Sequence, residues 1–302
     1  MKMQSSKWRN FIHRKFVRLA FVCVAMGLGS FSSAYALPLV TAPQAVGLLP
    51  EISAQVAGQV DFTAIIALDD CSGSLVRFTA SLGTDLALVL TNGHCYEGRR
   101  FLKAGEVLSD VPSSRKFKLL NAQGTRSLGT LTASRVLYAT MTRTDVTLYQ
   151  LTETYDQIEN EYGVRALTIS SSHPRASTQI AVVSGYWKKI YSCSIDRFVN
   201  EVKEDVWTWR DSILYTPGCD TIGGTSGSPI IDVATGDVIG VNNTANEDGE
   251  RCTLDNPCEV DGSGKVTVTE GARYGQETYL FYGCLGEDQS IDLNQPGCLL
   301  PK

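Results

Sequence analysis

The sequence predicts an all-β fold on three observations. Short runs of β-branched and aromatic residues recur along the chain, turn-forming residues separate these runs, and only residues 152–162 repeat apolar residues with a short helical period. Many short strands joined by regular turns are typical of β-sandwiches and β-barrels. The chain is long enough for one large all-β domain or two small ones.

The β-type runs fall into two groups along the chain. A clear hairpin turn, Ala234-Thr235-Gly236-Asp237, joins two runs of the second group. The first group comprises residues 60–68, 73–80, 86–91, 136–138 and 146–151. The second comprises residues 167–169, 179–186, 195–199, 212–215, 228–233, 237–242 and 265–269.

Residues 1–36 have the pattern of a secretory signal peptide. Six basic residues precede a short apolar run at residues 19–31, and Ala34-Tyr35-Ala36 forms a small-x-small cleavage signature. The alternative is a membrane anchor, which the shortness of the apolar run disfavours. We therefore expect a secreted protein, extracellular or periplasmic, cleaved near Ala36. Residues 37–56 then form an N-terminal arm or a propeptide.

The cysteine content agrees with secretion. Beyond Cys23 in the leader there are eight cysteines, an even number that predicts disulfides in a secreted chain. No Cys-x-x-Cys pair occurs, which argues against a zinc site, and we expect neither a metal nor a cofactor. The formal net charge of −5 gives no indication of a nucleic-acid partner. The eight are Cys71, Cys95, Cys193, Cys219, Cys252, Cys258, Cys284 and Cys298.

Ser226 lies among small residues, in Gly223-Gly224-Thr225-Ser226-Gly227-Ser228-Pro229, and is a candidate nucleophile. A serine hydroxyl needs a base, and the chain has only three histidines. Of these, His13 falls in the leader and His173 in a polar loop before a proline, so His94 is the candidate base. Asp145, at the start of a strand-like run, lies between them in the sequence, giving the order His, Asp, Ser.

Four motifs in this order resemble the trypsin-like, chymotrypsin-fold serine peptidases, in the form of their bacterial secreted members. They are Cys71-Ser72-Gly73-Ser74-Leu75-Val76, Thr91-Asn92-Gly93-His94-Cys95, Asp145-Val146-Thr147-Leu148 and Gly224-Thr225-Ser226-Gly227-Ser228-Pro229. The tail after about Gly249 carries almost none of the family pattern.

The resemblance implies two antiparallel six-stranded β-barrels with the active site between them. Barrel one would occupy about residues 57–160 and barrel two about 161–302, together the peptidase domain 57–302. It also implies that Ser226 attacks a carbonyl, His94 transfers the proton and Asp145 orients His94, with the Gly224 and Ser226 amides as the oxyanion hole. The cysteines flanking the histidine motif, Cys71 and Cys95, would form a disulfide.

The other disulfide pairings follow only from proximity in the sequence. Proximity pairs Cys193 with Cys219, Cys252 with Cys258, and Cys284 with Cys298. A Cys219–Cys252 bridge, tying the walls of the specificity pocket together, is the alternative.

Three departures from the family pattern concern activation and specificity. Thr225 replaces the aspartate that pairs with a newly cut N-terminal amine, and no Arg-Ile-Val-Gly-Gly cleavage motif precedes Cys71. Asn242-Asn243-Thr244 replaces the usual Ser-Trp-Gly substrate-binding edge. The oxyanion hole of this chain is therefore expected to form without a new N-terminus.

Asp220, six residues before Ser226, occupies the position at the base of the family's specificity pocket. A carboxylate there would favour Arg or Lys at the P1 position of a substrate. The alternative is that the neighbouring Cys219 shifts the turn, so that Asp220 faces water and Thr221 and Asn242 set the pocket. Asn243 is the remaining candidate substrate-binding residue.

The sequence therefore predicts a secreted, monomeric serine endopeptidase acting on proteins or peptides. Two alternatives remain: a catalytically silent homologue that binds proteins, and a secreted esterase on the same fold. A lipase-type site is excluded, because Gly-x-Ser-x-Gly would need glycine at Ser228 and a histidine after the serine. The acidic residues 246–250 fit no dedicated calcium motif and predict a solvated loop.

Overall fold

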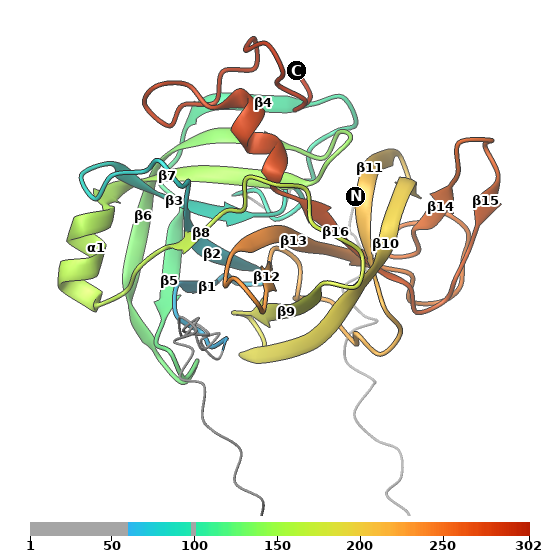
Figure 1. Ribbon diagram of the computed structural model, residues 1–302, viewed down its shortest axis with the longest axis horizontal. Helices are drawn as coiled ribbons and strands as arrows, with labels where there is room; N and C mark the ends of the chain where they lie inside the picture. The colour runs from blue at the N-terminus through green and yellow to red at the C-terminus, as the bar shows by residue number, and fades with distance from the viewer. Residues whose placement is uncertain (1–59, 98–100) are drawn as a thin grey trace, which may run out of the picture. The chain divides into compact units, whose positions relative to one another are not determined.

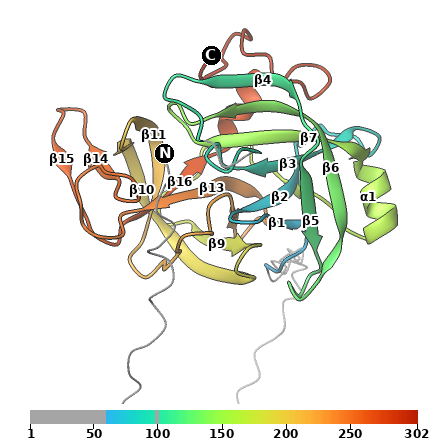
Figure 2. The same ribbon diagram turned by 180° about the vertical axis from the view of Figure 1, so that it is seen from behind.

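A computed structural model describes residues 60–97 and 101–302 (Figures 1 and 2). The leader 1–36 and the segment 37–56 expected from the sequence lie outside the described residues. The described residues all belong to one compact unit. Within its described part, no helix is long and apolar enough to cross a membrane.

The first sheet closes into a barrel of six strands. Its pairings run β1-β5-β6-β7-β3-β2, and β2 pairs again with β1, while β4 and β8 attach outside this ring. The six pairings of the ring are all antiparallel. The strands are β1 (Ile65–Ala67), β2 (Ser72–Arg77), β3 (Leu86–Thr91), β4 (Val107–Pro112), β5 (Lys116–Leu120), β6 (Ser127–Thr140), β7 (Val146–Thr154) and β8 (Leu167–Thr168).

The second sheet closes in the same way. Its ring runs β11-β16-β13-β12-β9-β10 and returns to β11, and the hairpin β14–β15 extends from β10 (Figure 1). Two antiparallel six-stranded barrels, as the sequence predicts, are thus confirmed. The strands are β9 (Gln179–Ser184), β10 (Lys189–Glu204), β11 (Trp207–Tyr215), β12 (Pro229–Asp232), β13 (Val238–Ala245), β14 (Cys258–Val260), β15 (Val266–Thr267) and β16 (Arg273–Glu277).

The one α-helix of the described residues, α1 (Tyr155–Tyr162), has defined signals at both ends. Thr154 and Gln157 form a capping box, in which each side chain accepts a hydrogen bond from the other residue's backbone amide. Gly163 ends the helix with a φ of 66°, a left-handed conformation that glycine adopts without strain. Tyr155 and Ile158 are the buried residues of the helix.

The two barrels meet beside β2. The Ser72 amide donates to the Ser226 carbonyl at 2.8 Å, and the hydroxyls of Ser72 and Ser184 lie 3.1 Å apart. One apolar cluster contains residues of both barrels, among them Leu88 of β3 and Val183 of β9. The loop that carries Ser226 is therefore hydrogen-bonded directly to the first barrel.

After β16 the chain returns to the first barrel. The 3-10 helix η2 (Tyr279–Cys284) places Phe281 against Phe78 and Tyr138, with ring centroids 6.4 and 6.3 Å apart. Near the end of the chain, the Pro301 carbonyl accepts a buried hydrogen bond of 3.0 Å from the Tyr138 hydroxyl. Residues that follow barrel two thus complete the core of barrel one.

Four disulfides are present among the described residues; the family resemblance implies the first of them, and sequence proximity predicts the other three. They join Cys71 to Cys95, Cys193 to Cys219, Cys252 to Cys258 and Cys284 to Cys298. Cys219 is bonded to Cys193, so the alternative bridge between Cys219 and Cys252 does not form.

We expect the double variant Cys71→Ala/Cys95→Ala to lose about 3 kcal/mol of unfolding free energy. The bridge spans 24 residues, and its loss restores the loop-closure entropy of the unfolded chain. The pair Cys252→Ala/Cys258→Ala spans only 6 residues and should lose less, about 2 kcal/mol. Urea unfolding of both variants measures the difference, and an equal loss in the two would contradict this account.

Candidate active site

His94 and Asp145 are brought together by the pairing of β3 with β7. His94 lies in the turn after β3, and Asp145 directly precedes β7. Thr91 at the end of β3 is opposite Thr147 of β7, so the turn after one strand lies beside the start of the other. The antiparallel register therefore places an imidazole next to a carboxylate that is 51 residues away in sequence.

The Asp145 carboxylate holds His94 through two hydrogen bonds. The His94 amide donates to Oδ1 at 2.9 Å, and His94 Nδ1 lies 2.8 Å from Oδ2. Asp145 is fully buried, and Asn92 donates to its backbone carbonyl at 2.8 Å. Since a carboxylate can only accept, Nδ1 carries the proton in the neutral ring and Nε2 keeps its lone pair.

Gly93 makes this close approach sterically feasible. A Cβ at position 93 would lie 2.8 Å from Asp145 Oδ1 and closer still to the Thr140 carbonyl. Any side chain there would push the turn away from the carboxylate, which explains a glycine directly before His94.

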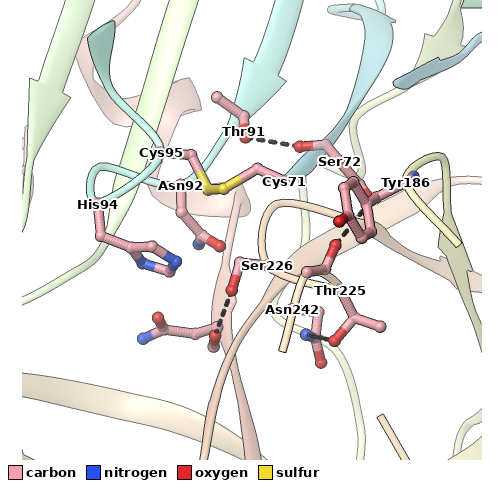
Figure 3. The surroundings of a disulfide bond; sticks show 12 residues. Cys71, Ser72, Thr91, Asn92, His94, Cys95, Tyr186, Thr225, Ser226 and Asn242 are labelled. Atoms are coloured by element: carbon pink, nitrogen blue, oxygen red, sulfur yellow. Dashed lines mark hydrogen bonds between the residues drawn. A yellow bond between two sulfur atoms is a disulfide. The ribbon is translucent and has the colours of Figure 1, made fainter. Parts of the chain in front are cut away.

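Ser226 lies in the turn between β11 and β12, flanked by two glycines with positive φ. Gly224 has a φ of 88° and Gly227 a φ of 76°, in the left-handed region that favours glycine. The Ser226 hydroxyl donates to the Asn243 carbonyl at 3.3 Å, and Ser226 and His94 line the same cavity. Figure 3 shows the His94 ring and Ser226 on the same side of the Cys71–Cys95 disulfide, below it in this view.

The turn before Ser226 is closed by hydrogen bonds of Thr225. The buried Thr225 hydroxyl donates to the Ile222 carbonyl at 2.6 Å and accepts from Asn242 Nδ2 at 3.0 Å (Figure 3). The Thr225 amide also donates to Ile222, at 2.9 Å. Among the described residues, the amides of Gly224 and Ser226 donate to no protein acceptor. Two unengaged amides beside a hydroxyl can stabilise an anion.

Carboxylates dominate the charge of the cavity. Glu204, Glu247 and Asp255 line it together with His94, and in the described part of the chain no lysine or arginine does. Glu204 is 5% exposed and accepts from the Thr244 hydroxyl at 2.6 Å and from the Asp255 amide at 2.9 Å. Burial raises the pKa of Glu204 to about 7 and also raises the pKa of Asp255.

The nearby carboxylates raise the pKa of His94. Burial alone would lower the pKa of His94, but the charge and hydrogen bond of Asp145, with the charges of Glu204 and Asp255, raise it above 6.5. The histidine therefore binds a proton more readily than a free imidazole does, and its neutral form requires a pH above this raised value.

A model of the trypsin-like peptidase domain matches residues 71–241 of the chain. The chain belongs to the trypsin-like peptidase family. No curated protein matches its sequence. The matched region begins at Cys71 and includes His94, Asp145 and Ser226, whereas Thr244 and the residues after it lie beyond its end.

Solved structures with a similar fold include several proteases, all at low identity. The protease domain of MamO from Magnetospirillum magneticum is 12% identical, with a TM-score of 0.46 over 76% of this chain and 98% of that chain. A Glu endopeptidase is 17% identical, with a TM-score of 0.39 over 72% and 85%. The HtrA-type protease AlgW is 14% identical, with a TM-score of 0.43 over 77% and 62%.

The other site residues expected for a trypsin-like peptidase divide into two sets. Thr221, Asn242 and Asn243 line the cavity with Ser226. Asp220 is exposed and does not line it, while the neighbouring Cys219 is buried. This position agrees with the alternative interpretation of the sequence, in which the turn at Cys219 leaves the Asp220 carboxylate facing water.

Sequence patterns did not indicate that Glu204, Asp255 and several aromatic side chains line the cavity. Phe101, Trp207 and Trp209 line it, with the rings of Phe101 and Trp207 packed edge to face at 5.6 Å. Glu204 is the last residue of β10, a strand rich in polar residues, and Asp255 lies in a loop. Neither residue therefore belongs to a local sequence motif that would indicate an active site. Only the pairing of β10 with β11 and with β14 brings them to the site.

We expect the pKa of His94 to lie above 6.5 and to fall in Asp145→Asn, because the asparagine keeps the shape of the side chain and removes its charge. Glu204→Gln should lower this pKa less, since Asp145 is the larger of the two influences that raise it. NMR titration of the His94 ring measures all three values. An unchanged pKa in Asp145→Asn would show that the ion pair does not control the ring.

Proposed function

We propose that this protein is a secreted serine endopeptidase that cleaves peptide bonds through an acyl-enzyme formed on Ser226. The observation that carries the proposal is the joint position of His94, bonded at Nδ1 to buried Asp145, and Ser226 on one cavity. Membership of the trypsin-like peptidase family supports protein or peptide substrates. Four disulfides fit an extracellular or periplasmic protein.

In the proposed reaction, Ser226 Oγ attacks the substrate carbonyl as His94 Nε2 takes its proton. The Ser226 hydroxyl must first break its hydrogen bond to the Asn243 carbonyl. This bond is long, at 3.3 Å, and a rotation about χ1 of Ser226 breaks it. Asp145 keeps the ring in the required tautomer and stabilises the imidazolium. His94 then returns the proton to the leaving amine, and water releases the acyl group by the same route.

The amides of Gly224 and Ser226 are proposed to bind the oxyanion. One such donor typically contributes about 3 to 4 kcal/mol to lowering the barrier. The hydrogen bonds among Thr225, Ile222 and Asn242 support an oxyanion loop that is organised without a newly cut N-terminal amine. This fits the presence of threonine where trypsin-like enzymes use aspartate.

We further propose that the cavity prefers a basic side chain, Arg or Lys, at P1 or the neighbouring substrate position. The support is its three carboxylates, Glu204, Glu247 and Asp255, rather than Asp220, which faces water. A cation bound beside Glu204 would favour its ionised form, so the preference should strengthen as the pH rises through about 7.

Replacing the proposed nucleophile or base should abolish turnover. We expect Ser226→Ala and His94→Ala each to reduce kcat by about 10⁴ to 10⁶, and the double variant to be little worse, because the residues act as a unit. Hydrolysis of a peptide library and of matched ester substrates, together with labelling by a fluorophosphonate, measures this. Ser228→Ala is the matched control and should leave labelling intact.

The same experiment separates the alternatives. A protein that neither turns over peptides nor reacts with the fluorophosphonate would be a binding homologue. Hydrolysis of esters alone would make it an esterase. Normal turnover in His94→Ala would contradict the proposed mechanism.

For specificity, we expect Glu204→Gln to reduce kcat/KM for Arg and Lys substrates by about 10-fold or more. Norleucine substrates, which lack the charge, should change little. Asp220→Asn is the control and should alter neither class, because Asp220 lies outside the cavity. A loss of basic preference in Asp220→Asn but not in Glu204→Gln would restore the pocket assignment made from the sequence.

A further inference from the structure

Three potential metal ligands meet on barrel two, outside the cavity of Ser226. His173 lies in the loop before β9, Asp211 in β11 and Glu277 at the end of β16. His173 Nε2 is 3.2 Å from Asp211 Oδ2 and 2.9 Å from Glu277 Oε1. The three residues come from segments that are far apart in the sequence, and none of them lines the cavity.

The ring of His173 presents its Nε2 lone pair to the two carboxylates. Nδ1 lies 2.6 Å from the Pro174 carbonyl, which can only accept, so Nδ1 carries the proton of the neutral ring. Phe198 and Tyr279 pack against the imidazole, with ring centroids 4.4 and 5.2 Å away. In metal sites, a ligating histidine typically donates its other N–H to such a carbonyl or to a carboxylate.

Glu277 is a buried carboxyl group that faces the His173 ring. Its side chain is 1% exposed, and His173 Nε2, 2.9 Å from Oε1, is the one side-chain nitrogen among the described residues that is paired with it. The described residues also include no lysine or arginine paired with Glu277 or Asp211. Burying a carboxylate without compensating positive charge is costly. A cation at the point where the three ligand atoms converge would compensate both carboxylates.

We propose that His173 Nε2, Asp211 and Glu277 bind one Zn²⁺ ion, with water in the fourth position. One imidazole and two carboxylates suit zinc, whereas Ca²⁺ and Mg²⁺ prefer oxygen ligands alone. Tetrahedral zinc with bonds of about 2.1 Å separates its ligand atoms by roughly 3.4 Å. The observed separations of 2.9 and 3.2 Å from Nε2 need only small movements to reach this geometry.

The site is structural in this proposal. The ion joins the loop before β9 to β11 and to the end of β16, directly before η2 carries the chain back to barrel one. Bound zinc neutralises both carboxylates, and because it binds the folded state it stabilises that state by mass action.

Zinc binding can be assigned to His173 in the full chain carrying His13→Gln and His94→Ala, in which His173 is the only histidine. After treatment with a chelator, Zn²⁺ is added while isothermal titration calorimetry and the NMR signals of the single imidazole are recorded. We expect one ion per chain, a shift of the Nε2 resonance, and a rise in Tm of about 5 to 10 °C at 100 times the Kd. Ca²⁺ should shift neither the resonance nor the Tm.

Ligand variants in the same background test the geometry. Glu277→Gln and Asp211→Asn should each weaken Zn²⁺ binding on the order of 100-fold, and His173→Asn should abolish it. Asp196→Asn, which removes an exposed carboxylate elsewhere on the barrel, is the control and should bind zinc like the background. Circular dichroism checks that each variant is folded. An imidazole unaffected by Zn²⁺, or equal affinity in Glu277→Gln and the background, would overturn the site.

Discussion

The buried negative charge of Asp145 is the constraint on which the candidate active site depends. A carboxylate with no exposure to water must be compensated from within the protein, and here the His94 amide and ring supply two hydrogen bonds. That requirement fixes the turn after β3, demands a glycine at position 93 and selects the tautomer of His94. The Cys71–Cys95 disulfide holds the same turn to the start of β2, whose Ser72 is bonded to the Ser226 carbonyl. One buried charge thus connects the geometry of both barrels at their junction.

The sequence predicted those parts of the fold and site whose signals are local. The order of the His94, Asp145 and Ser226 motifs indicated the family, and runs of β-branched residues located β2, β3, β7 and β9. It missed β4, β5, β14, β16 and the first part of β6, because these segments are short or interrupted by polar and charged residues. β10 and β11 proved much longer than the predicted runs 195–199 and 212–215, since each continues as a mostly polar ribbon.

Residues brought together only by tertiary pairing could not be read from the sequence. Glu204 reaches the cavity because β10 extends to the Thr244 hydroxyl, and Asp220 misses it because its neighbour Cys219 is bonded to Cys193. The sequence analysis predicted no metal, because it considered only the spacing of the cysteines. His173, Asp211 and Glu277 have no regular spacing and meet only through the strand order of barrel two. Long-range strand pairing and one disulfide therefore place the residues that local motifs leave open.

The return of the chain to barrel one after β16 has a consequence for biosynthesis. Leu300 and Pro301 are buried, and Pro301 is bonded to Tyr138 of β6, in the barrel that is synthesised first. The first barrel therefore cannot complete its core until residues 279–301 have been translated, so its completion follows synthesis of the second barrel. A chain interrupted near its end would leave Phe78 and Tyr138 without their partner Phe281. Completion of the barrel that carries His94 and Asp145 is thus conditional on residues that are translated after the second barrel.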